Sequence, residues 1–283
     1  MSFREKTKKI HFRPGQFFDH FILILLLCLM VYPLFMAVWC SFKSTAQFNL
    51  TKWYPTLPLN FENIAYAVKT LYRYILNTLL VGGVGTLGML IVSSLAAFAF
   101  ARMPFYGKNI LYAMVIALMM IPAIMTLVPS FMLYKSLVGT NTYAILILPI
   151  VTGGSVFGVF LLTGFFGGVN ESIFEAARID GASDFTCYLR ICLPLSVPIL
   201  TTLAIMQLSG AWNDYIWPMI AIPSATEKLT IAAAIKKEFL ASNTGSYPTL
   251  FSGYLVASIP LILLYVFSNR FYVEGLTNAA VKF

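Results

Sequence analysis

Charged side chains are scarce in this chain. Aspartate, glutamate, lysine and arginine make up 11% of its 283 residues, whereas about 25% is typical of soluble domains. Hydrophobic residues make up 59%, and the mean hydropathy is +0.81. This apolar excess extends over almost the whole chain and leaves little polar sequence for a separate soluble domain. The composition therefore predicts a single membrane domain over residues 1–283.

Sequence signatures of catalysis, nucleotide binding and metal binding are also lacking. The chain has no Gly-x-x-x-x-Gly-Lys-Ser/Thr loop to hold phosphates, so it is not expected to bind ATP itself. No nucleophile, base and orienting group occur at a recognisable spacing. The four cysteines and two histidines do not have the spacing of metal ligands. We therefore predict a non-enzymatic chain with no catalytic residue, no metal site and no cofactor of its own.

One glycine pattern imitates the dinucleotide-binding fingerprint. Gly83, Gly85 and Gly88 match G-x-G-x-x-G, but that motif needs a preceding strand and an acidic residue about 20 positions later. Neither is present. The three glycines lie inside a long apolar run, where small residues let membrane helices approach closely. We interpret them, together with Gly154 and Gly158, as helix-packing positions.

Long apolar runs dominate the sequence. A membrane helix needs about 20 mainly apolar residues, and six runs meet that length. Their apolarity is continuous, which fits helices and excludes the alternating pattern of barrel strands. The prediction is an all-α, polytopic membrane protein with six transmembrane helices, at roughly Phe17–Ser41, Tyr74–Ala101, Ile110–Tyr134, Tyr143–Phe166, Ser196–Ile222 and Thr249–Phe271.

The first apolar run is interpreted as a retained span. A signal peptide has an apolar core of about 7–15 residues and a small-residue cleavage site, whereas Phe17–Ser41 is much longer and has no convincing site. A basic cluster before this run favours a cytoplasmic amino terminus. Six spans then place the carboxyl terminus on the same side. The cluster consists of Arg4, Lys6, Lys8, Lys9 and Arg13.

Three hydrophilic connections interrupt the apolar runs. Under this orientation, residues 42–73 and the loop 223–248 lie outside, where they could touch an external partner. The loop 167–195 lies in the cytoplasm and carries several charged residues in a chain otherwise poor in charge. That loop is the strongest candidate for a functional surface.

The cytoplasmic loop has the signals of two short helices joined by a glycine. Ser172 and Glu175 have the spacing of a capping box at a helix start. Gly181 can adopt the left-handed conformation that ends a helix, and Ser183 can cap a second one. Pro194 is expected to stop that second helix. The pattern predicts helix, glycine turn, helix.

The predicted helix pair carries an apolar face. Small residues on its first helix, Ala176 and Ala177, leave room for close approach. A pair of this kind suits docking into a groove on another protein; the alternative is a helix that lies on the membrane surface. The apolar face follows the helical period and consists of Phe185, Tyr188, Leu189 and Cys192.

The spacing within the loop resembles the EAA loop of the permease subunits of binding-protein-dependent ABC importers. Three further segments are similar to the maltose-type oligosaccharide branch of that family, and within it to the second, smaller permease: residues 102–108, 212–218 and 271–282. The resemblance also implies that one set of loop residues couples this chain to an ATPase. These residues are Glu175, Ala176, Ala177, Asp180, Gly181, Ile191, Leu193 and Pro194.

The resemblance implies a type I importer permease fold and a function. The chain would translocate a carbohydrate, an oligosaccharide or related glycoside, across a bacterial cytoplasmic membrane. An extracytoplasmic solute-binding protein would deliver the sugar, a second permease would form a heterodimer with this chain, and two cytoplasmic ATPase subunits would bind ATP and Mg. The loop 223–248 would reach toward the binding protein, and the tail Glu274–Phe283 toward the ATPase.

A short segment of the fifth run is the candidate substrate pathway. A carboxylate in an apolar stretch is by default a functional hypothesis, and its aromatic neighbours could face a sugar ring. The alternatives are a hydrogen bond in helix packing and anchoring at the membrane interface. An ion-coupled secondary carrier, the competing function, would also need this carboxylate as an ion site. The residues are Trp212, Asn213, Asp214 and Tyr215.

Overall fold

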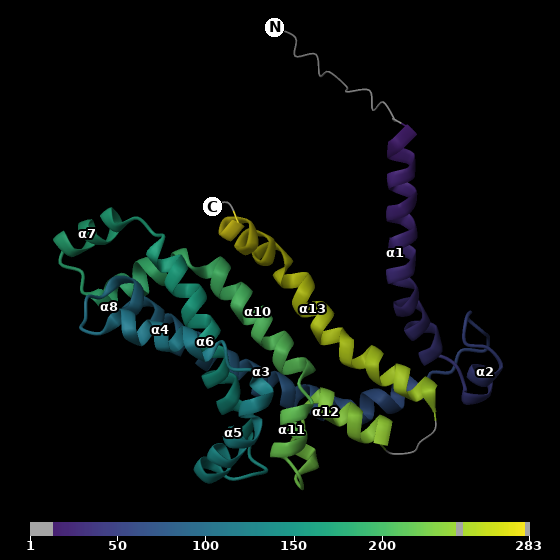
Figure 1. The fold of residues 1–283 in the computed structure, drawn as a ribbon. Helices are drawn as coiled ribbons and strands as arrows, with labels where there is room; N and C mark the ends of the chain where they lie inside the picture. The colour runs from purple at the N-terminus through teal and green to yellow at the C-terminus, as the bar shows by residue number, and fades with distance from the viewer. Residues whose placement is uncertain (1–13, 242–245, 281–283) are drawn as a thin grey trace.

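The structure, a computed structural model, describes residues 14–241 and 246–280. Within these residues every regular element is helical, which confirms the predicted fold class (Figure 1). Four helices contain a stretch long and apolar enough to cross a membrane alone: α1 (Pro14–Ser41), α3 (Glu62–Arg102), α6 (Tyr143–Gly167) and α13 (Tyr247–Ala280).

Two further membrane-length segments are broken. The pair α4 (Lys108–Leu118) and α5 (Ala123–Val138) is bent by 102°. Residues 184–195 and α10 (Val197–Asn213) are bent by 74°. The part of the chain that the structure describes therefore has four to six candidate spans, depending on whether each bent pair crosses once.

Short helices fill the connections between these segments. They cap the bundle at both ends and carry the polar loops. They are α2 (Thr45–Leu50), α7 (Glu171–Ile179), α8 (Asp184–Cys187), the π-helical turn η1 (Tyr188–Cys192), α9 (Leu193–Leu195), α11 (Ile216–Ala221), η2 (Thr226–Lys228), α12 (Ile231–Ile235) and η3 (Lys236–Ala241).

The boundaries of α3 differ from the predicted span. The helix begins at Glu62, within the segment 42–73 predicted to be a hydrophilic connection. Its first turns are amphipathic: Ala67 and Leu71 are fully buried, while Lys69 and Arg73 are exposed. At about 1.5 Å per residue, its 41 residues span roughly 60 Å, which is about twice the hydrocarbon thickness of a bilayer. A search for apolar runs finds only the part of α3 inside the membrane.

The fifth predicted span is also divided in the structure. The interval 196–222 was predicted as one continuous span, but α10 ends at Asn213 and α11 begins at Ile216. Asp214 lies between them and accepts hydrogen bonds from two amides of α11. A helix start needs such an acceptor, because its first amides have no partner within the helix.

Close packing of α3 against α6 forms the centre of the bundle. A Cβ at Gly85 would lie 2.7 Å from the Ile150 side chain, and one at Gly158 would lie 2.7 Å from Ser93. The helices therefore approach more closely than side chains at these positions would allow. The helix-packing interpretation is confirmed for Gly85, Gly88, Gly154 and Gly158, but it is wrong for Gly83, where a Cβ would meet nothing within 4 Å. α10 and α13 also pack against α3, and α10 contacts α6 as well.

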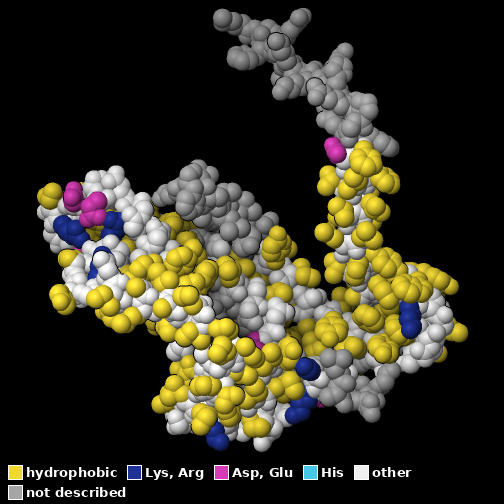
Figure 2. Space-filling model, viewed as in Figure 1, with side chains coloured by type: hydrophobic (Ala, Val, Ile, Leu, Met, Phe, Trp, Pro, Cys, Tyr) yellow, Lys and Arg dark blue, Asp and Glu magenta, His cyan; other side chains and the backbone are white. Residues whose placement is uncertain are grey.

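α1 stands apart from the bundle except near its end (Figure 1). Its most apolar window has no buried residue, and Figure 2 shows hydrophobic side chains along its length. It packs against α13. An apolar helix in this position is stable only against lipid or another membrane protein. The basic cluster before it, Arg4 to Arg13, lies outside the described residues.

Candidate functional site

The loop 167–195, which was predicted to be cytoplasmic and is called the cytoplasmic loop below, carries α7, and the cap of this helix differs from the predicted one. Asn170 is the N-cap, and its side-chain oxygen accepts a hydrogen bond from the Ser172 amide at 3.1 Å. The predicted capping box between Ser172 and Glu175 is wrong, because the helix already begins at Glu171. Glu175 instead lies exposed on the outer face of α7.

The glycine turn after α7 has the predicted geometry. Gly181 has φ of +82°, a left-handed conformation that other residues rarely adopt. Its amide donates to the Arg178 carbonyl at 3.0 Å, and the Ala182 amide donates to the Ala177 carbonyl at 2.9 Å. Ser183 then caps α8 by accepting from the Thr186 amide at 3.2 Å. The helix-glycine-helix prediction is confirmed here.

The second arm of the loop continues further than predicted. The backbone passes through the π-helical turn η1 and α9 to Leu195, and the break comes at Ser196. Pro194 therefore does not stop the helix; it occupies the first turn of α9, where a missing amide hydrogen is tolerated. The π turn also changes the helical phase. The predicted apolar face is therefore divided: Tyr188 and Cys192 are buried within this chain, whereas Phe185 is 62% exposed and Leu189 is also exposed.

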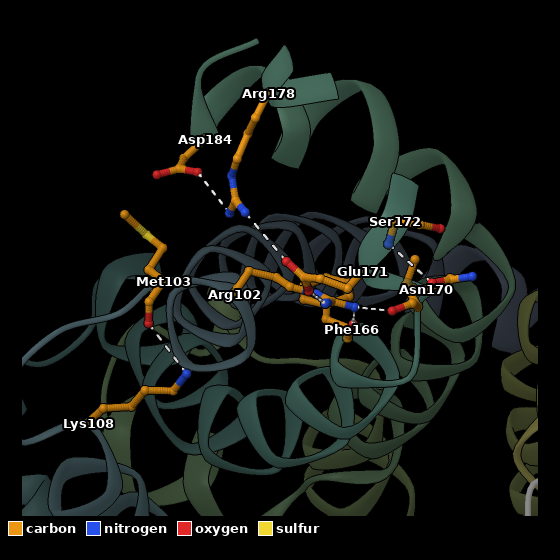
Figure 3. Close-up of polar contacts among 10 residues, drawn as sticks. Arg102, Met103, Lys108, Phe166, Asn170, Glu171, Ser172, Arg178 and Asp184 are labelled. Atoms are coloured by element: carbon orange, nitrogen blue, oxygen red, sulfur yellow. Dashed lines mark hydrogen bonds and ion pairs between the residues drawn. The ribbon is translucent and has the colours of Figure 1, made fainter. Parts of the chain in front are cut away.

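Arg102, at the last turn of α3, lies beneath the start of α7 (Figure 3). Its side chain is 6% exposed. Its guanidinium donates to the carbonyls of Phe166 and Val169 and pairs with the Glu171 carboxylate. The guanidinium carbon also lies 4.4 Å from the ring centre of Phe174, which is fully buried. One cation thus joins the end of α3 to the end of α6 and the start of α7.

The second arm is joined to α3 as well. The hydroxyl groups of Ser94 and Tyr188 form a buried hydrogen bond of 2.8 Å. The rings of Phe98 and Tyr188 lie 5.5 Å apart. These contacts belong to an apolar cluster that also holds Phe174, Cys192 and the end of α6. Both arms of the loop therefore rest on the same turns of α3.

The outer surface of the loop is partly apolar and partly charged. Ile179 is 86% exposed, and Ile173 and Phe185 are also exposed. Figure 2 shows acidic and basic side chains gathered around the same end of the molecule. Arg178 forms exposed ion pairs with Glu171 at 3.4 Å and Asp184 at 3.5 Å. Pairs of this kind contribute little to stability.

The predicted site residues of the loop separate into two groups. The first is exposed and available to a partner: Glu175, Ala176, Asp180, Gly181 and Pro194. The second is partly buried and packs against the apolar cluster beneath α7: Ala177, Ile191 and Leu193. The second group supports the loop from below. Arg102 belongs to the same support, and sequence reasoning missed its role, although it heads the motif at 102–108.

The candidate substrate residues near the end of α10 mostly serve local structure. Trp212 is 9% exposed, and its indole nitrogen donates to the Ala257 carbonyl at 3.2 Å. The Asn213 side chain donates to the Ser209 carbonyl at 2.8 Å. Asp214 accepts from the amides of Ile216 at 3.0 Å and Trp217 at 3.2 Å.

A cavity of about 570 Å³ opens beside this segment. Trp212, Asn213 and Tyr215 contribute to its wall, and α12 and α13 supply the rest, including Tyr254. The Lys236 ammonium lies 3.9 Å from the ring centre of Tyr215. Asp214 is not part of the wall. The structure thus brings three of the four predicted residues to one cavity and assigns the carboxylate to a helix cap.

The capping role of Asp214 predicts a difference between two substitutions. Asp214→Ala removes the acceptor and is expected to cost about 1 kcal/mol of unfolding free energy. Asp214→Asn keeps an acceptor and is expected to cost much less, because Asn and Asp cap helices about equally well. Thermal unfolding of both variants in detergent measures this difference. An equal loss of stability in both would contradict the capping role.

The loop 223–248, which was predicted to be external and is called the external loop below, is hydrogen-bonded to α3 at the opposite end of the molecule. The Asn77 side chain donates to the carbonyls of Glu227 at 2.8 Å and Leu229 at 3.0 Å. The Ile231 amide donates to the Thr78 hydroxyl at 2.8 Å. Residues 242–245 of the predicted loop 223–248 and residues 281–283 of the tail lie outside the described residues.

Comparison with known proteins identifies related sequences and folds. The family described as "Binding-protein-dependent transport system inner membrane component" matches residues 89–276. The putative ABC transporter permease protein ORF2 of Caldicellulosiruptor sp. is 31% identical over 286 residues, with 100% of each chain covered. The arabinooligosaccharides transport system permease protein AraQ of Halalkalibacterium halodurans is 27% identical over 258 residues, covering 89% of this chain and 91% of that one.

A solved structure shares the fold. It is a chain of a bacterial ABC transporter involved in the import of the acidic polysaccharide alginate. That chain is 21% identical to this one, with a TM-score of 0.81 over 94% of this chain and 100% of that one.

Proposed function

The chain belongs to the family of binding-protein-dependent transport system inner membrane components, and we propose that it imports an oligosaccharide or related glycoside with energy from ATP. Three relatives support the substrate class, since their names refer to arabinooligosaccharides, alpha-glucosides, and melibiose, raffinose and stachyose. All of these are short glycosides. In this role the chain is a permease subunit, the conduit for the sugar, and forms or breaks no bond.

The construction of the cytoplasmic loop carries the proposal. Its inner side is held by Arg102 and the apolar cluster, while its outer side presents Ile179, Ala176 and Glu175 to the cytoplasm. An anchored short helix with an exposed apolar face fits a groove on another protein. We propose that this groove belongs to an ATPase subunit, which binds ATP and Mg because this chain has no phosphate-binding loop.

Two further partners are proposed, one for the external loop and one for α1. We propose that the external loop 223–248 meets a solute-binding protein. A related solved transporter supports this, since it is described in complex with a pentasaccharide-bound periplasmic protein.

We also propose that the exposed apolar face of α1 packs on a second permease. α1 begins and α13 ends on the side of α7 (Figure 1), which agrees with both termini being cytoplasmic.

We propose that the cavity beside α10 forms part of the sugar translocation pathway in this subunit. Tyr215 and Tyr254 line it with partly exposed rings, and aromatic faces suit the apolar faces of sugar rings. Trp212 and Asn213 shape its wall while holding α10 in place. Asp214 is expected to act only as a cap.

Purification of the native chain from its source membranes tests the proposal. We expect ATPase subunits and a second permease to accompany it. Proteoliposomes of that complex, with its binding protein, should take up a labelled glycoside from a panel of di- to pentasaccharides only when supplied with Mg-ATP. An ionophore that abolishes ion gradients should leave uptake unchanged. Absence of any ATPase, together with uptake that follows an ion gradient, would replace this function with that of a secondary carrier.

A further inference from the structure

α3 has polar contacts with both proposed docking loops. It is a single helix of 41 residues. Asn77 and Thr78 hold the external loop, and Arg102 and Ser94 hold the cytoplasmic loop. From residue 77 to residue 102 the helix rises by roughly 37 Å, at about 1.5 Å per residue. The two attachments are therefore separated by more than the thickness of the hydrocarbon core.

The attachment at the external end is buried and specific. Asn77 is 7% exposed. Its amide donates to two carbonyls of the external loop, and its oxygen accepts from the Tyr143 hydroxyl at 2.9 Å. Loss of this side chain would leave two loop carbonyls without their donors. Unpaired buried polar groups are costly, so the loop is expected to follow the movement of this turn of α3.

The attachment at the cytoplasmic end has the same character. The Arg102 guanidinium has a planar fork of donors, which here joins two carbonyls at the end of α6 and the carboxylate of Glu171. Phe174 covers its face. The start of α7 cannot shift relative to α3 without breaking several of these contacts together.

The covalent route between the same two loops is interrupted. α10 leads from the cytoplasmic loop toward the external loop, but the chain bends by 74° at Ser196 and breaks again at Asp214. A helix with two breaks can absorb a displacement by bending. α3 has no break between its two attachments, so a displacement at one end reaches the other.

We propose that α3 is the strut that couples the external loop to the cytoplasmic docking loop, with Asn77 and Arg102 as the positioning residues at its two ends. The inference rests on the proposed function, which supplies a partner at each loop. When the ATPases close, α7 moves, Arg102 carries α3 with it, and Asn77 carries the external loop. Coupling of this kind is reciprocal, so a protein bound outside also biases α7.

The test uses the complete transporter in nanodiscs, with Mg-ATP and orthovanadate as the probe that traps the ATPases closed. Hydrogen exchange is measured at the amides of residues 224–235 before and after trapping. In the native complex we expect trapping to change exchange in this segment by about fivefold or more, the lower end of usual coupling strengths. Arg102→Met and Asn77→Leu are each expected to abolish that change.

Nucleotide trapping itself should persist in both variants, because neither residue contacts nucleotide. Ser93→Ala is the matched control: its hydroxyl is buried on the same helix and bonds the Met89 carbonyl one turn earlier. This variant should transmit the change as the native complex does. Arg102→Lys keeps the charge but not the fork, so it should lose transmission even if Arg102→Met fails to assemble. A double Arg102→Lys, Asn77→Leu variant should lose no more than either single one.

The outcomes separate the strut from the proposed function. If the native complex traps no nucleotide, the assignment as an ATP-driven importer fails. If it traps nucleotide but residues 224–235 do not respond, or if all variants respond like the native complex, only the strut is overturned. A purely structural role for Asn77 and Arg102 would lower thermal stability and leave the response intact, which also overturns it.

Discussion

Replacing Ile179 by aspartate is expected to strip the ATPase subunits from the purified complex and to abolish ATP-driven uptake. Ile179 is 86% exposed at the end of α7, so the isolated chain gains nothing from its side chain. In a groove the same side chain would be desolvated, and a carboxylate there would lack a partner. Residues at the centre of an interface typically account for about 2 kcal/mol or more, which corresponds to roughly a thirtyfold loss of affinity.

Leu50→Asp is the matched control for this experiment. Leu50 is also 86% exposed, but it lies at the end of α2, far from α7 (Figure 1). Both variants should insert into the membrane and have the same unfolding temperature as the native protein. Only Ile179→Asp should separate from the ATPase on size-exclusion chromatography. Full ATPase occupancy in Ile179→Asp would show that α7 is not the docking helix.

Local backbone chemistry explains why parts of the cytoplasmic loop were predictable. Gly181 and Ser183 act through their own conformation and nearest amides, so the sequence alone indicates the turn and the second cap. The capping box failed for a related reason. Asn170 offers an equally good cap two residues before Ser172, and nothing local decides between them.

Tertiary contacts determined the features that were missed. In the second arm, Tyr188 is buried and its hydroxyl bonds that of Ser94 on α3, a long-range contact that the sequence does not reveal. Arg102 donates to the backbone carbonyls of Phe166 and Val169. Every residue type has a backbone carbonyl, so the sequence does not indicate such a contact. A single sequence could show a basic residue near the membrane, but not the groups that it joins.

The candidate substrate segment stays a prediction. Three of its four residues line one cavity, which the sequence did not indicate. The carboxylate was given too much weight. Asp214 lies at a break between two helices, and hydropathy does not reveal such a break inside an apolar run.

Gly158→Leu is expected to destabilise the bundle strongly. A Cβ at this position would lie 2.7 Å from the Ser93 Cβ and 3.3 Å from the Met89 sulfur. Relief requires α3 and α6 to separate, because the Ser93 Cβ is fixed to the backbone of α3. Overpacking usually costs about 1–3 kcal/mol, and more where the backbone has to move. Since domains are stable by only about 5–15 kcal/mol, we expect a clearly lower unfolding temperature and a reduced yield of monodisperse protein in detergent.

Gly153→Leu separates this packing effect from the general effect of losing a glycine. Gly153 lies on the same helix, five residues earlier, and a Cβ there would meet nothing within 4 Å. An apolar side chain on this open face has room, and leucine is a better helix former than glycine. Gly153→Leu should therefore give native yield and an unfolding temperature at or above the native one. Equal yields for the two variants would contradict the close contact between α3 and α6 at Gly158.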